Sequence, residues 1–145
     1  MLQLNEERWQ QALEGNSQGV WDWNVQTNEV FRSISWKIML GFEPHEIRDT
    51  FSEWETRVHP EDLPRAQAEV ERHLRGQTAA YSSEYRIRCK DGTYKWILDQ
   101  GKVMSRTPDR KPLRVIGTHS DISERKKAEQ DIRESAERFA GIFQT

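Results

Sequence analysis

The sequence predicts an α+β fold, in which a five-stranded antiparallel sheet carries short helices on one face. Three observations lead to this prediction. Apolar and charged residues alternate from Glu84 to Lys90, as in a half-buried strand, and Asp91-Gly92 then gives a strong hairpin signal. A second alternating stretch, Gly19 to Gln26, contains two tryptophans. Between these two regions the apolar residues recur at helical spacing.

The N-terminal part predicts a flanking helix followed by a hairpin. Apolar residues are spaced as on one helix face from Leu4 to Glu14, and Gly15-Asn16 can end that helix. The strand Gly19 to Gln26 then turns at Thr27-Asn28 into a second strand, Glu29 to Arg32. These two strands are expected to form the N-terminal hairpin of the sheet.

The middle of the chain predicts several short helices and one longer one. Ser35 to Leu40 and Thr50 to Val58 have helical spacing, with a single turn expected around Glu46-Ile47. His59 to Asp62 places a proline and two acids where the first turn of a helix favours them. Gly76 is expected to end this longest core helix, whose apolar stripe is Leu63, Ala66, Val70 and Leu74.

Two more strands follow the Asp91-Gly92 turn. Tyr94, Trp96 and Leu98 share one face of the first, and we expect that face to point into the core, with Trp96 as an anchor. Ser105 to Pro112 is polar and contains two prolines, which indicates a loop. The last strand begins at Leu113 and leads into Gly-Thr-His-Ser-Asp-Ile-Ser.

The C-terminal segment predicts a long exit helix. Charged residues of both signs dominate Glu124 to Arg138, around a narrow apolar seam of the coiled-coil type. We therefore expect a homodimer that forms through the flanking helices. Glu137-Arg138-Phe139 also echoes Glu7-Arg8-Trp9, which suggests that another domain of the same kind begins here. The seam consists of Ala128, Ile132, Phe139 and Phe143.

Composition narrows the function classes. The 145 residues suffice for one domain, and the net charge of −2 gives no electrostatic reason to expect nucleic-acid binding. The single cysteine, Cys89, excludes an internal disulfide and favours a reducing compartment such as the cytoplasm. No apolar run has the length of a membrane span, so no direct membrane contact is expected.

Nucleotide-binding glycine loops, nucleophile elbows and metal-ligand spacings are absent from the sequence, so we expect a regulatory domain rather than an enzyme.

The order of these segments resembles that of the PAS family. A strand, an Asp-Gly turn, a strand with tryptophan, a third strand and then Asp-Ile-Ser-Glu-Arg-Lys-Lys are similar to the C-terminal half of a PAS domain. GVWDWNVQTNEV and the His59 to Asp62 motif add to the likeness, which covers Trp9 to Lys127. In that family an Asp-Ile-Thr triplet joins the core to an output helix, so the resemblance implies a signal junction at Asp121, Ile122 and Ser123.

The resemblance implies three parts: a flanking helix at residues 1–16, a sensory domain at 17–122 and a signalling helix at 123–145. It also implies a sensory or signal-relay module of a multidomain protein. That protein would be a histidine kinase or a cyclic-dinucleotide cyclase or phosphodiesterase. The alternative is a ligandless module for dimerisation and spacing, with a packed core.

Cofactors are possible but not favoured. Some haem-binding PAS domains use a histidine on the long helix, which would be His73 here; the alternative is a partly exposed histidine near the helix end. Cys89 lies at the hairpin tip and lacks the helical Asn-Cys-Arg motif of flavin-adduct photosensors. Non-covalent flavin binding stays open, since it needs mainly an apolar slot.

A group of large side chains could line a ligand pocket. The alternative, which we favour, is a filled core with at most a small cavity. In a pocket, Tyr85, Trp96 and His119 would supply the polar tips. The candidates are Trp36, Met39, Phe42, Trp54, Leu74, Tyr85, Trp96, Leu98 and His119.

Overall fold

The structure is a computed structural model that describes residues 18–143. It confirms the predicted α+β fold with one five-stranded antiparallel sheet, in the order β2-β1-β5-β4-β3. The last strand in sequence, β5, therefore lies at the centre of the sheet. The strands are β1 (Gly19–Asn24), β2 (Glu29–Arg32), β3 (Tyr81–Arg88), β4 (Tyr94–Arg106) and β5 (Pro112–Asp121).

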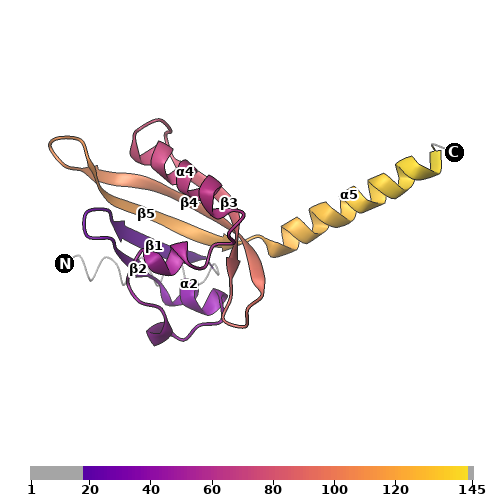
Figure 1. The fold of residues 1–145 in the computed structure, drawn as a ribbon, viewed down its shortest axis with the longest axis horizontal. Helices are drawn as coiled ribbons and strands as arrows, with labels where there is room; N and C mark the ends of the chain where they lie inside the picture. The colour runs from indigo at the N-terminus through magenta and orange to yellow at the C-terminus, as the bar shows by residue number, and fades with distance from the viewer. Residues whose placement is uncertain (1–17, 144–145) are drawn as a thin grey trace.

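The short helices lie between β2 and β3 in sequence and cover one face of the sheet (Figure 1). The longest helix, α5, instead projects away from the body of the domain (Figure 1). The core fills the space between the sheet and the short helices. The helices are α2 (Ile34–Met39), η1 (Pro44–Glu46), α3 (Ser52–Glu55), α4 (Leu63–Leu74) and α5 (Ser123–Phe143).

Two predicted helix boundaries were wrong. Helix α4 begins at Leu63, so Pro60 is not in its first turn; the amide of Leu63 donates to the carbonyl of His59 (3.0 Å), which closes a turn there. Pro64 takes the first-turn place that suits a residue without an amide hydrogen. Helix α3 is a single turn rather than the whole of 50–58. The helix predicted at Leu4 to Glu14 lies outside the described residues.

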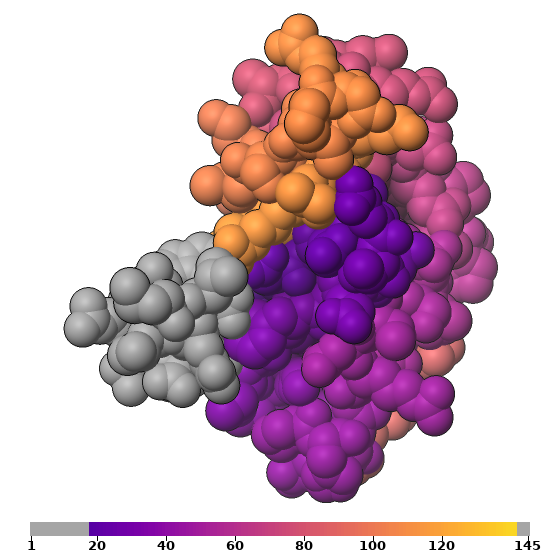
Figure 2. All heavy atoms as spheres, turned by 90° about the vertical axis from the view of Figure 1, so that its left-hand side faces the viewer, coloured from indigo at the N-terminus to yellow at the C-terminus, as the bar shows by residue number. Residues whose placement is uncertain are grey.

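The predicted hairpin at Asp91-Gly92 is confirmed. Arg88 of β3 pairs with Tyr94 of β4 across the turn, and Gly92 has a φ of 87°, a conformation that suits glycine. Strand β4 runs on to Arg106, so the following loop is shorter than the sequence suggested. Figure 2 looks onto the end of the molecule opposite α5, where this orange β4–β5 hairpin lies beside the indigo hairpin of β1 and β2.

The predicted faces of β4 were reversed. Ile97 and Asp99 point into the core and are 0% and 4% exposed, whereas Trp96 and Leu98 lie half-buried on the opposite face. The register explains this, because Ile97 is paired with Tyr85, whose side chain is fully buried. Since strand side chains alternate with a period of two, assigning one residue to the wrong face reverses the assignment of the whole strand. Trp96 is therefore not the core anchor that we expected.

Candidate functional site

A small cavity lies between the sheet and the short helices. Its volume is about 50 Å³. One ordered water needs roughly 10–15 Å³ of such space, so the cavity holds a few waters or one very small molecule. Drug-sized and cofactor ligands occupy pockets of about 300–1,000 Å³. Among its lining residues are Trp21, Trp36, Trp54, His73, Asp99 and His119.

A buried carboxylate, that of Asp99, lies at the centre of a hydrogen-bonded cluster in the cavity wall. Its Oδ1 accepts from the indole Nε1 of Trp21 (2.8 Å). Its Oδ2 accepts from the hydroxyls of Tyr85 (2.8 Å) and Tyr81 (3.2 Å). Three donors thus compensate a charge that would be costly to bury alone. We call Asp99, Trp21, Tyr81, Tyr85 and His119 the Asp99 cluster.

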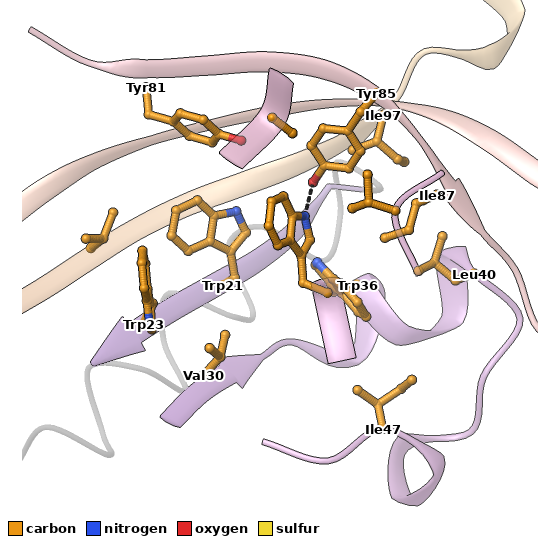
Figure 3. Close-up of a cluster of buried hydrophobic side chains, with 14 of the residues drawn as sticks. Trp21, Trp23, Val30, Trp36, Leu40, Ile47, Tyr81, Tyr85, Ile87 and Ile97 are labelled. Carbon is orange, nitrogen blue, oxygen red and sulfur yellow. Dashed lines mark hydrogen bonds between the residues drawn. The ribbon is translucent and has the colours of Figure 1, made fainter. Parts of the chain in front are cut away.

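The hydroxyl of Tyr85 joins this cluster to α3 and β5. It accepts from Nε1 of Trp54 (2.7 Å), a bond that Figure 3 shows, and its oxygen lies 2.9 Å from Nε2 of His119. Because its single proton points to Asp99, Nε2 of His119 must carry a proton to bond the same oxygen. Burial, together with the charge of Asp99, raises the pKa of Tyr85 well above its ordinary value. The phenol is therefore a stable donor at neutral pH.

Two glycines make room for Trp21 within the sheet. Gly101 and Gly117 are partners across β4 and β5, and Trp21 of β1 is paired with Gly117. A methyl group at Gly101 would lie 2.6 Å from the ring of Trp21. At Gly117 it would overlap both that ring and the carbonyl oxygen of Gln100. The flat indole can therefore lie across the strands and reach Asp99 only because both positions lack a side chain.

The environment predicted for His73 was wrong. The residue is 5% exposed and lines the cavity. Its Nε2 accepts from the amide of Val103 (3.0 Å), so the proton is on Nδ1, which lies 3.1 Å from the carbonyl oxygen of Thr78. Both ring nitrogens are engaged, and haem ligation would have to break one of these bonds.

Cys89, next to the hairpin turn, is buried as well, with 6% exposure. Burial raises the pKa of its thiol, which disfavours the reactive thiolate. Within residues 18–143, no group of three or more His, Cys, Asp and Glu side chains is placed to hold a metal ion.

The predicted pocket residues fall into four sets. Trp36, Trp54, Leu74 and His119 line the cavity. Tyr85 lies one hydrogen bond behind its wall, as described above. Met39 and Phe42 pack against the core without lining the cavity, and Trp96 and Leu98 lie on the other face of the sheet.

The sequence interpretation missed two charged members of the site, Asp99 and Arg32, which are both at most 4% exposed. The only signal for Asp99 was its alternation with Trp96 and Leu98, which was assigned to the wrong face. Arg32, at the end of β2, gave no signal because an arginine at a strand end normally points to solvent.

The predicted signal junction continues the β4–β5 pairing into α5. The amide of Ile122 donates to the carbonyl of Trp96 (2.9 Å), and the amide of Trp96 donates to the hydroxyl of Ser123 (3.0 Å). Oδ1 of Asp121 accepts from the amide of Ser123 (2.9 Å), and Lys95 lies 3.5 Å from its Oδ2. Partial burial opposes ionisation of Asp121, but these bonds outweigh it and lower its pKa.

A group of charged side chains fastens the first turn of α5 to the outer face of the sheet. Lys126 lies over the ring of Trp96 (4.8 Å to the centroid), with Arg86 at 5.4 Å. The carboxylate of Glu84 binds Lys126 and Arg125, each at 2.7 Å. We call Glu84, Arg86, Trp96, Arg125 and Lys126 the helix latch. Trp96 thus contacts the exit helix instead of a ligand.

Comparison with known proteins places the fold in a family. Residues 29–119 match the family described as the PAS fold. A crystal structure of a sensory box histidine kinase/response regulator from Burkholderia thailandensis superimposes with a TM-score of 0.80 at 34% identity, covering 92% of this chain and 98% of that one. The N-terminal domain of a diguanylate cyclase with PAS/PAC sensor from Marinobacter aquaeolei gives a TM-score of 0.65 at 28% identity, covering 75% and 98%.

Among curated proteins, the probable diguanylate cyclase DgcE of Escherichia coli is 32% identical over 129 residues, which cover 88% of this chain and 10% of that protein. The chain spans 12% or less of the curated relatives that it matches. Across residues 18–143, none of the helices combines the length and apolar character that crossing a bilayer requires. The matched segment and the similar solved structures agree with one another, and the chain belongs to the PAS family.

Proposed function

We propose that this chain is a sensory and signal-relay module, in which the state of the cavity changes how α5 is held. The observation that carries the proposal is that two strands bear both sites. Strand β4 carries Asp99 in the cavity wall and Trp96 at the latch, and β5 carries His119 in the wall and leads into the junction at Asp121. A ligand that moves the inner side chains of these strands therefore acts on the hydrogen bonds that hold the helix.

Binding would act by a population shift between a latched and a released arrangement of the first turn of α5. The latch suits such a role because its ion pairs are partly exposed, and exposed pairs are each worth only about 0–1 kcal/mol. A modest difference in ligand affinity between the two arrangements is then enough to shift the balance. In this scheme residues 17–122 form the sensor and residues 123–145 the signalling helix.

The parent protein would be a multidomain histidine kinase or a cyclic-dinucleotide cyclase or phosphodiesterase, with this chain as a regulatory part that has no catalysis of its own. Support comes from the similarity of this chain to parts of histidine kinases and of diguanylate cyclases, which are other proteins. The module would act as a homodimer through its flanking helices. Support comes from Ile132 and Phe139, which are 70% and 64% exposed and lie seven positions apart on α5.

A second candidate function is a ligandless module for dimerisation and spacing. The small size of the cavity favours it, since about 50 Å³ leaves room for no more than a few waters or one very small molecule. On this alternative the buried residues of the Asp99 cluster only stabilise the core, and changes there do not reach α5 beyond their effect on overall stability.

Hydrogen exchange separates the two functions. Replacing His119 by Phe removes the bond to Tyr85, and the relay predicts faster exchange of the Ile122 and Lys126 amides, which hold the junction and first turn. Ile47→Val is a control, because Ile47 is 4% exposed and does not line the cavity. Its expected cost is about 0.5–1.5 kcal/mol. Equal exchange at α5 in two variants of equal stability would contradict the relay.

The output of the parent protein gives the second test. Asp121→Ala should leave the sheet folded, since losing a cap of this kind costs about 0.5–2 kcal/mol. It should abolish the difference in output between the stimulated and unstimulated states, because the helix loses its fixed departure from β5. Normal switching in this variant would remove the role assigned to the junction.

A further inference from the structure

A buried arginine without an acidic partner lies at one side of the cavity. Arg32 is 4% exposed and lines the cavity, and its guanidinium carbon lies 4.8 Å from the ring centroid of Trp36. Its Nη1 donates to the carbonyl of Arg48 (3.2 Å). No carboxylate among residues 18–143 forms a salt bridge with it. A guanidinium has five N–H donors, so most of its donor capacity is not taken up by these contacts.

The charges of two acidic residues, Glu53 and then Asp49, act on Arg32, but neither carboxylate forms a salt bridge with it. The carboxylate of Glu53 pairs instead with Arg57 (3.0 Å) and accepts from the amide of Arg48 (2.8 Å). Burial lowers the pKa of Arg32 to about 10, which still leaves it cationic at neutral pH. A buried charge without a counter-ion is unfavourable, so this side of the cavity favours an anion.

A second donor is unpartnered beside the arginine. Trp36 is 1% exposed, and its Nε1–H has no hydrogen-bond partner among the described residues. Figure 3 shows the nitrogen edge of this indole turned toward the middle of the cluster, and Trp36 lines the cavity. Buried N–H groups are nearly always paired, so this donor indicates a missing acceptor.

The acidic group in the cavity wall already has its own hydrogen-bond donors. Asp99 is the acidic residue there, and its two oxygens already accept from Trp21, Tyr81 and Tyr85. A cationic ligand would have to displace one of these donors. The remaining walls are aromatic and aliphatic, among them Trp23, Phe51 and Val70. The cavity wall thus offers unpartnered donors on two neighbouring residues, Arg32 and Trp36, and apolar contact elsewhere.

We propose that the cavity binds a small carboxylate, whose anionic group is held by the guanidinium of Arg32 and the indole N–H of Trp36. This inference rests on the proposed sensory function and names the class of its ligand. The volume of about 50 Å³ sets the size. At roughly 10–15 Å³ for each water-sized group, it fits about three to five non-hydrogen atoms. Acetate and propionate are therefore suitable probes, with the short alkyl chain against the aromatic wall.

The test is an NMR titration of the ¹⁵N-labelled 145-residue chain with sodium acetate and sodium propionate. Sodium chloride at matched ionic strength and neutral propionamide serve as controls. The Nε1–H resonance of Trp36, assigned by its loss in Trp36→Phe, should shift and saturate with the carboxylates alone. Arg32→Met and Trp36→Phe should each weaken binding by about tenfold or more, since each removes a charge-assisted hydrogen bond.

Arg88→Met is the matched control, because Arg88 is exposed at the end of β3 and should leave the affinity unchanged. Thermal unfolding of each variant verifies that it folds, and Arg32→Gln supplies a second neutral replacement. Shifts that do not saturate, or that sodium chloride reproduces, overturn the proposal. Binding of propionamide as tight as that of propionate also overturns it, yet leaves the sensory function standing. The sensory function fails separately, if cavity variants do not change hydrogen exchange at α5.

Discussion

Asp99 of β4 and His119 of β5 are direct partners in the sheet register, and their side chains meet in the core, with Nε2 of the imidazole 3.4 Å from Oδ2 of the carboxylate. Both are at most 4% exposed. An acidic and a basic side chain at adjacent central positions are an unusual choice for a core. Their hydrogen bonds to Tyr85 and Trp21 make the pair part of the packing and also part of the cavity wall.

The first prediction concerns the cost of removing this carboxylate. Asp99→Ala leaves the donors of Trp21, Tyr81 and Tyr85 without their acceptor, and each buried unsatisfied group costs about 1–3 kcal/mol. We expect the free energy of unfolding to fall by at least about 3 kcal/mol in urea denaturation. Asp131→Ala on the exposed face of α5 is the control and should change stability by less than about 0.5 kcal/mol. A loss of similar size in both variants would show that the cluster contributes little.

The second prediction concerns the space beneath Trp21. Gly117→Ala puts a methyl group into the ring of Trp21 and the carbonyl oxygen of Gln100, and the backbone atom cannot move away cheaply. Overpacking of this kind costs about 1–3 kcal/mol. Gly141→Ala makes the same chemical change on α5. Outside the helix's own backbone, no atom would lie within 4 Å of the added methyl group there, so the substitution should be neutral or stabilising. Equal melting temperatures for the two variants would contradict this account of Gly117.

The elements that local rules govern were predictable from the sequence. The hairpin followed from Asp91-Gly92, because few residue pairs adopt the backbone angles that a tight turn needs. The change from strand to helix after Asp121 followed from a resemblance, which depends on the order of motifs along the chain, whereas the signalling role of this junction stays a prediction. Neither required knowledge of which side chains meet across the sheet.

The interior of the site was not predictable in this way. Asp99 alternates with Trp96, and hydrophobicity alone puts the tryptophan inside and the carboxylate outside. The opposite holds because three donors from β1 and β3 converge on the carboxylate, while Lys126 and Arg86 cover the tryptophan. These partners lie far apart in sequence, so only the assembled sheet reveals them.

The third prediction follows from the outer position of Trp96. Trp96→Ala should lower the free energy of unfolding by only about 1–2 kcal/mol, because it removes two cation–π contacts worth about 0.5–1 kcal/mol each. Ile97→Ala, one residue on but fully buried, should cost about 2–5 kcal/mol. Hydrogen exchange at the Lys126 amide should accelerate more in Trp96→Ala than in Ile97→Ala, although Trp96→Ala should be the more stable of the two variants. The reverse order at α5 would mean that Trp96 does not hold the helix.

The fourth prediction concerns pH. The ion pairs with Lys126, and then Arg125, lower the pKa of Glu84 below its ordinary value. A carboxyl group with a lowered folded-state pKa stabilises the latch fully above its unfolded value of about 4.3, and this contribution is lost as the pH falls through the folded-state value. We therefore expect the amide chemical shifts of Ser123 and Lys126 to change in acid. Burial opposes ionisation of Asp121, but its hydrogen bonds with Ser123 and the charge of Lys95 lower the pKa of this group as well, so the Glu84→Gln variant isolates the contribution of Glu84. An unchanged titration in that variant would contradict the assignment.

The last prediction concerns self-association through α5. This helix projects from the domain, and Ile132 and Phe139 are exposed on it, although an isolated polar helix gains little from its own hydrogen bonds in water. A second copy of the helix would cover the seam. Ile132→Asp puts a charge into that contact and should weaken the dimer by at least about tenfold in sedimentation equilibrium. The matched control is Ile38→Asp, since Ile38 is 61% exposed but lies on α2, away from the seam. It should leave the dimer intact. A wild-type chain that stays monomeric at high concentration, or equal weakening by both substitutions, would exclude α5 as the dimer contact.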